Sequence, residues 1–149
     1  MDLDRLLDLR EHFKEWFEGG RAWVHYLGDE LRIAVDSPSV DRAIFLRFVV
    51  ETVRAIKALK LQGESDSFDV VSVITEGQVL IREWRNCRYV EGPAALKAHR
   101  WMGTKKILAG QIGAPTAFQE SLSLGIKSRP AMFDGEAGKL FSFSNGGPQ

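Results

Sequence analysis

The segment from Ser39 to Leu61, SVDRAIFLRFVVETVRAIKALKL, is rich in apolar residues and contains neither glycine nor proline. The apolar residues at 40, 44, 48, 49, 53, 56 and 59 recur three or four positions apart, which is the spacing of a helix face. Phe45, Leu46 and Val50 widen that face and leave only a narrow polar stripe. A helix this apolar is covered on more than one side. The segment therefore predicts a long central helix, covered either by the rest of the domain or by another chain.

Residues 22–35, AWVHYLGDELRIAV, place strand-forming residues on both sides of Gly28 and Asp29. Glycine followed by aspartate suits a two-residue turn between antiparallel strands. We expect a hairpin in which Leu27 lies opposite Glu30. In this register His25 falls on the mixed face of the hairpin, which makes it a surface or interface residue.

Two further hairpins are expected downstream. Residues 69–85, DVVSVITEGQVLIREWR, predict a hairpin that turns at Glu76 and Gly77 and is apolar on both faces. A hairpin of this kind lies centrally in a sheet or inside an interface. The segment 132–143, MFDGEAGKLFSF, predicts the last hairpin of the chain.

Three more helices are expected around these hairpins. Residues 2–18 carry an amphipathic pattern, and Pro93 suits the first position of a helix that continues through AALKAHRWM. Thr116 and Gln119 form a candidate capping box for a short helix that ends at Gly125. The expected fold class is α+β, with antiparallel hairpins forming one sheet packed with the long central helix and flanking helices.

Length and composition predict one domain. A chain of 149 residues with 44% hydrophobic residues can build one sizeable core, and we expect a single domain over 1–143 followed by a short tail at 144–149. The single cysteine, Cys87, excludes an intrachain disulfide, and no Cys/His spacing matches a zinc site. The acidic, amphipathic start is unlike a secretory signal, and no apolar run is long enough to span a membrane. We therefore expect a cytoplasmic protein without a cofactor, a metal or a membrane contact.

The formal net charge is zero, but the two halves of the chain differ. Residues 1–80 carry 15 acidic and 10 basic side chains, whereas residues 81–149 carry 5 acidic and 10 basic ones. The halves therefore have net charges of −5 and +5. Such polarity can steer a partner or orient two subunits head to tail.

The segment 82–106 concentrates basic side chains, with aromatic residues between them. Cations neutralise phosphates and aromatic rings stack on bases, so this mixture is typical of RNA or single-stranded DNA binding. The competing interpretation is a solvated surface with tryptophans in the core, and the zero net charge falls short of a nucleic-acid-binding domain. The residues that would form a partner or nucleic-acid surface are Arg82, Arg85, Arg88, Lys97, His99, Arg100, Trp101, Lys105 and Lys106.

These observations rank three functions. The first is a non-enzymatic protein-interaction module, meaning an assembly subunit, adaptor or chaperone-like binder that forms oligomers, because the apolar surface exceeds what a monomer of this size needs. The second is nucleic-acid binding through 82–106. The third is a small enzyme with scattered active-site residues, for which Cys87 and His99 could act as a nucleophile and base only if the fold brought them together.

Overall fold

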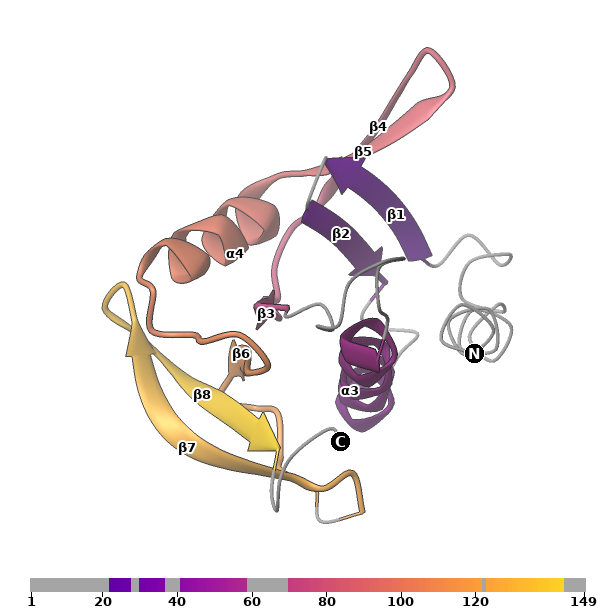
Figure 1. The fold of residues 1–149 in the computed structure, drawn as a ribbon. Coiled ribbons are helices and arrows are strands. Elements are labelled where there is room, and N and C mark those ends of the chain that lie inside the picture. Colours follow the sequence, from indigo (N-terminus) through magenta and orange to yellow (C-terminus); the bar gives the residue numbers. More distant parts are fainter. Residues whose placement is uncertain (1–21, 28–29, 37–40, 59–69, 122, 144–149) are drawn as a thin grey trace, which may run out of the picture.

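The structure is a computed structural model that describes residues 22–27, 30–36, 41–58, 70–121 and 123–143 (Figure 1). Its strands form three separate sheets. The expected helix over 2–18 and the tail at 144–149 lie outside the described residues. The first sheet is a hairpin of β1 (Ala22–Leu27) and β2 (Glu30–Val35), and Leu27 pairs with Glu30, which confirms the predicted register.

The largest sheet has four strands in the order β3-β6-β8-β7. Its strands are β3 (Ser72–Val73), β6 (Ile112–Pro115), β7 (Ile126–Phe133) and β8 (Glu136–Phe143). The predicted C-terminal hairpin is confirmed as β7 and β8, and its turn residues Asp134 and Gly135 have φ values of 52° and 80°. Positive φ at both turn positions gives the backbone twist that a two-residue hairpin turn needs.

The predicted hairpin over 69–85 is wrong. β3 pairs in parallel with β6, and the true hairpin joins β4 (Leu80–Trp84) to β5 (Cys87–Glu91), with its turn at Arg85 and Asn86. The segment that was expected to turn at Glu76 instead runs beside the next helix, where Gln78 O accepts a hydrogen bond of 3.0 Å from Ala94 N. These backbone contacts hold the segment extended, so the strands 70–75 and 78–84 never meet.

The described residues form two helices, α3 (Arg42–Ala58) and α4 (Pro93–Gly103). α4 begins at Pro93 as predicted. Asp41 caps the start of α3, because its Oδ1 accepts a hydrogen bond from Ala43 N at 2.6 Å. The segment expected to form a short helix after Thr116 consists of turns and a single β-bridge.

The α+β class is confirmed, but one sheet packed with a long central helix and flanking helices is not what the structure shows. The physical reason is the altered strand pairing: moving the turn from residues 76–77 to 85–86 separates β3 from β4, which divides the expected sheet. The buried side chains of α3 are at 46, 48, 50, 53 and 55, which occupy more than one helix face. Much of its apolar surface is thus covered within one chain, while Ile44 is 50% exposed.

The core has two parts. The larger cluster joins Leu46, Val50 and Val53 of α3 to buried residues of the four-stranded sheet and its connections, which are Ile74, Ile112, Ala114, Phe118, Ile126 and Phe141. The smaller cluster joins Trp101 of α4 to Ile107, Phe133 and Leu140. The four-stranded sheet therefore contributes to both clusters and holds α3 and α4 in one body.

Candidate functional site

The structure divides the predicted basic surface between two places. Arg82, Arg85 and Arg88 lie on the β4–β5 hairpin, whereas the remaining residues lie on α4 or just after it. Trp101 is not at the surface, because it is buried and its ring lies 4.8 Å from that of Phe133, between ring centroids. Its Nε1 has no hydrogen-bond partner among the described residues.

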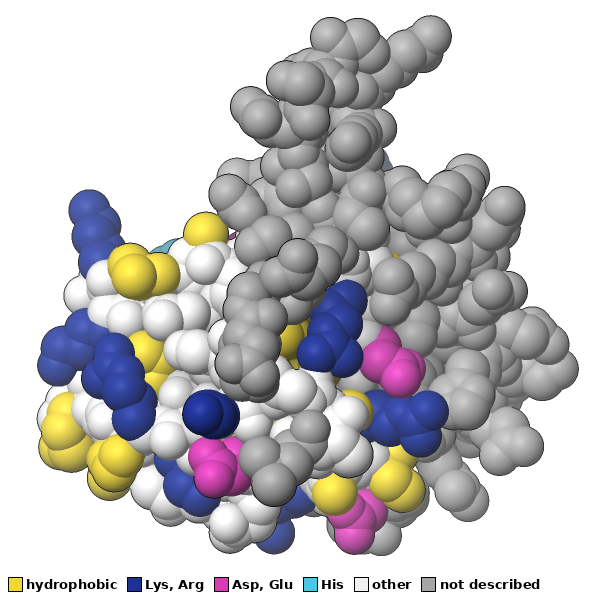
Figure 2. Space-filling view, turned by 60° about the horizontal axis from the view of Figure 1, so that its bottom comes forward, with side chains coloured by type: hydrophobic (Ala, Val, Ile, Leu, Met, Phe, Trp, Pro, Cys, Tyr) yellow, Lys and Arg dark blue, Asp and Glu magenta, His cyan; other side chains and the backbone are white. Residues whose placement is uncertain are grey.

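Most of the basic side chains in this segment have partners within the chain. Arg82 pairs with Glu91 at 3.2 Å and Arg88 with Glu83 at 3.0 Å. On and after α4, the pairs are Lys97 with Glu136, Arg100 with Asp134 and Glu136, and Lys106 with the carbonyl of Met132. On the face drawn in Figure 2, Lys and Arg side chains are spread out, and some of them lie beside Asp or Glu side chains. Internal pairing reduces the charge that is available to a polyanion.

The β4–β5 hairpin, which we call the arm, projects beyond the β1–β2 hairpin and α4 (Figure 1). The strand register places Leu80, Arg82 and Trp84 on one face of the arm. Their cross-strand partners on that same face are Glu91, Tyr89 and Cys87, in that order. Leu80 is 48% exposed and Trp84 is 60% exposed. The arm therefore presents an outer face with apolar side chains at both ends.

The turn of the arm is strained at one residue. Arg85 and Asn86 have φ values of 51° and 63°. Asparagine tolerates this left-handed region, but for an arginine it costs roughly 1–2 kcal/mol. The strained turn places the guanidinium carbon of Arg85 4.5 Å from the ring centroid of Trp84, where the cation can interact with the ring face. Positive φ at both positions is also what a two-residue hairpin turn needs, as at Asp134 and Gly135.

Two side chains of the β1–β2 hairpin anchor the arm. His25 Nδ1 accepts a hydrogen bond of 3.1 Å from Val90 N, and Arg32 Nη1 donates one of 3.0 Å to Val90 O. His25 is only 6% exposed, and its ring packs edge-on against that of Tyr89. The expectation of a surface histidine is wrong, because the outward-facing backbone edge of β5 needs a partner and this ring supplies it.

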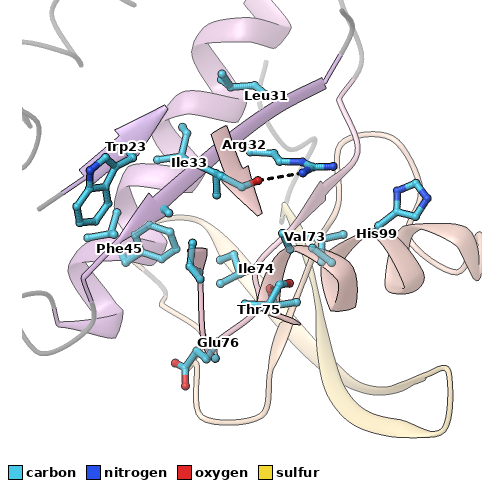
Figure 3. Close-up of a pocket in the computed structure, with 18 of the residues that line it drawn as sticks. Trp23, Leu31, Arg32, Ile33, Phe45, Val73, Ile74, Thr75, Glu76 and His99 are labelled. Atoms are coloured by element: carbon cyan, nitrogen blue, oxygen red, sulfur yellow. Dashed lines mark hydrogen bonds between the residues drawn. The ribbon is translucent and has the colours of Figure 1, made fainter. Parts of the chain in front are cut away.

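A cavity of about 430 Å³ lies at the base of the arm, between the β1–β2 hairpin, α3, β3 and α4 (Figure 3). Trp23 and Phe45 lie at one end and His99 at the other, with Ile33 and Ile74 between them. Small-molecule sites have volumes of roughly 300–1,000 Å³ and mainly apolar walls. This cavity falls within that volume range, and its lining mixes apolar side chains with polar and charged ones.

Sequence reasoning missed this cavity, although α4 carries a signal for it. Ala94, Ala98 and Met102 follow each other at four-residue intervals and all line the cavity, together with Ala95. Helix residues four apart share one face. A buried helix face made of alanines leaves space where larger residues would fill a core, but the sequence does not show what lies opposite that face.

Charged residues at the rim of the cavity are paired. Arg42 Nη2 donates to Glu76 Oε2 at 3.0 Å, and this hydrogen bond from Arg42 lowers the pKa of Glu76 below its ordinary value. Arg32 Nε donates to Glu30 Oε1 at 3.1 Å. A second hollow of about 450 Å³ adjoins the cavity and shares Arg32, Ala95 and His99 with it.

The structure does not bring Cys87 and His99 together. Cys87 is exposed and pairs with Trp84 next to the turn of the arm, whereas His99 lies on α4 at the rim of the cavity. Within the described ranges, no group of three or more His, Cys, Asp or Glu side chains could hold a metal ion. No helix in the part of the chain that the structure describes is long and apolar enough to cross a membrane.

Comparisons with protein-family models, with curated proteins and with solved structures gave no match to this chain.

Proposed function

We propose that the protein is a non-enzymatic interaction module, an assembly subunit that associates with a second copy of itself through the outer face of the arm. One observation carries the proposal: Leu80 and Trp84 are exposed on a hairpin that projects from the body and is tipped by a strained arginine. Tryptophan and arginine are the residues that most often dominate binding energy in protein interfaces. An exposed Trp84 stacked by Arg85 is therefore suited to anchor a protein contact.

Charge supports a second copy as the partner. All of the arm except Leu80 belongs to residues 81–149, whose net charge is +5, and residues 1–80 have a net charge of −5. Opposite charges on two parts of the same chain favour head-to-tail contact between copies. The free edge of the arm, strand β4, carries Arg82 and Glu83, and charged residues at a strand edge disfavour unlimited edge-to-edge pairing. We therefore expect the two copies to contact each other through side chains of the outer face of the arm.

Light scattering at micromolar concentration tests the proposal. The wild-type protein should have a mass above 16.7 kDa at low salt, and added salt should shift it toward the monomer because it screens the opposite charges. Trp84→Lys should give a monomer at low salt. Leu108→Lys is the matched control, because Leu108 is 62% exposed on the loop between α4 and β6, outside the arm.

The control variant should assemble as the wild type does. Circular dichroism and melting temperature should be nearly equal for all three proteins, since both substituted side chains are largely exposed. A wild-type mass of 16.7 kDa at every salt concentration, or an oligomer that Trp84→Lys leaves intact, would overturn the proposed function.

A further inference from the structure

We propose that the cavity at the base of the arm binds a neutral, flat, largely apolar molecule that carries one hydrogen-bond acceptor. This inference concerns a different part of the molecule from the proposed assembly surface and does not depend on it. Its grounds are the size of the cavity, the chemistry of its walls and the state of the charges around its rim.

Cavity size limits the ligand. A protein cavity of about 150 Å³ holds one benzene molecule. The volume of about 430 Å³ found here therefore suits a molecule of roughly 12 to 18 non-hydrogen atoms, by the same ratio of volume to atoms. A two-ring aromatic compound falls in this range.

The walls favour a flat ring system. Trp23, Phe45 and Phe118 line the cavity together with aliphatic side chains from β2, β3 and α4. Aromatic rings prefer offset-stacked or edge-to-face contacts with other rings. On the opposite wall, Ala94 and Ala98 each contribute only a methyl group, so their side chains take up little of the cavity. The space between these walls is therefore wide enough for a ring and is lined to contact one.

The donor for the acceptor group is Arg32. Its side chain extends toward the His99 end of the cavity (Figure 3), and two of its nitrogens, Nε and Nη1, already bond Glu30 and the Val90 carbonyl. A guanidinium has five N–H donors, and among the described residues Nη2 has no acceptor, which leaves both of its N–H groups for a further acceptor. Arg32 also lines the adjoining hollow, which places this donor at the boundary between the apolar cavity and the outer space.

The rim charges favour a neutral ligand over an anion. Arg32 has Glu30 as its counter-ion and Arg42 has Glu76, while Glu91 in the adjoining hollow pairs with Arg82. Asp36 also lines the cavity and has no ion-pair partner among the described residues. With its cations compensated and one carboxylate left over, the rim would repel an anion.

Three matched probes separate these features. 2-Acetylnaphthalene is neutral and carries a carbonyl acceptor, 2-naphthoate replaces the ketone by a carboxylate, and 2-ethylnaphthalene lacks an acceptor. Equilibrium dialysis of each probe against the wild-type protein should give saturable binding of the ketone at micromolar concentration. The carboxylate and the hydrocarbon should each bind at least tenfold more weakly.

Two variants locate the binding. Ala98→Trp should abolish ketone binding because the indole occupies the cavity, and Ala98→Leu, which adds less volume, serves if the first variant does not fold. Ala109→Trp places the same indole at an exposed position and should bind the ketone as the wild type does. Three outcomes would overturn the inference: no saturable ketone binding below about 1 mM, unchanged binding by a folded Ala98 variant, or carboxylate binding as tight as that of the ketone.

Discussion

Lys105 is a residue whose backbone conformation favours a different side chain. It follows Thr104, which caps the C-terminus of α4, and its φ is 59°. Its N–H donates to Met102 O at 3.2 Å and so closes the last turn of the helix. Glycine is the usual residue at this position, because it adopts the left-handed region without steric cost.

We therefore predict that Lys105→Gly raises the free energy of unfolding by about 0.5–1 kcal/mol, since it relieves the left-handed strain. Lys106→Gly is the matched control: it removes the same charge from the next residue and also the hydrogen bond from Lys106 Nζ to Met132 O, which spans 2.8 Å. The control should lower the stability. Urea denaturation of both variants checks the prediction, and a decrease for Lys105→Gly would contradict the strain argument.

At the scale of elements, the short strand β3 joins the first half of the chain to the four-stranded sheet. Ile74, which follows it, is 4% exposed in the larger core cluster, and Val73 packs against the smaller one. Val71, just before the strand, is 38% exposed. Residues 71, 73 and 74 therefore lie in three different environments.

Val73→Asp and Ile74→Asp should each strongly destabilise the protein, with Ile74→Asp losing more than about 4 kcal/mol, because a buried carboxylate lacks both water and a counter-ion. Val71→Asp should change the free energy of unfolding by less than about 0.5 kcal/mol, since its side chain reaches solvent. Thermal melting compares the three. A melting temperature of Ile74→Asp close to that of Val71→Asp would show that the core placement of β3 is incorrect.

The elements predicted correctly from the sequence are those whose turns or ends are marked by residues close together in the chain. The first and last hairpins have glycine in their turns, and α4 has Pro93 at its start. The β4–β5 turn was missed because arginine rarely adopts positive φ, so Arg85 and Asn86 carry a weaker turn signal than Glu76 and Gly77. The pairing of β3 with β6 was missed because it joins residues 72 and 112, and no local pattern encodes that contact.

The candidate sites also depend on contacts between segments that are distant in the sequence. The segment 82–106 was singled out for its composition, but the ion partners of Arg100 and Lys97 are Asp134 and Glu136, which lie on the turn and strand of the last hairpin. The cavity needs the β1–β2 hairpin, α3 and α4 to converge. Such sites depend on tertiary contacts between distant segments, and these contacts are what a single sequence leaves open.

At the scale of the whole molecule, the charge pattern predicts weak attraction for nucleic acid. The basic half is opposed by the acidic half, and four of its ten cations form ion pairs within the described residues. We expect no appreciable binding of labelled single-stranded RNA in fluorescence-anisotropy titrations at about 50 mM salt, where phosphate contacts are least screened.

The triple reversal of Arg85, Arg88 and Arg100 to Glu is the companion measurement. Micromolar binding by the wild type that disappears in this variant, without a change in melting temperature, would support a nucleic-acid surface on 82–106 instead.

The larger core cluster takes its residues from both halves of the chain, and this affects folding during synthesis. Leu46 and Val50 of α3 are buried against residues that include Ile126 and Phe141, near the end of the sequence. A ribosome adds roughly 5–20 residues per second, so on the order of ten seconds separate the synthesis of α3 from that of β8. During that interval the apolar face of α3 lacks the residues of β7 and β8 that complete its cover, so this face stays partly exposed until the last hairpin has emerged.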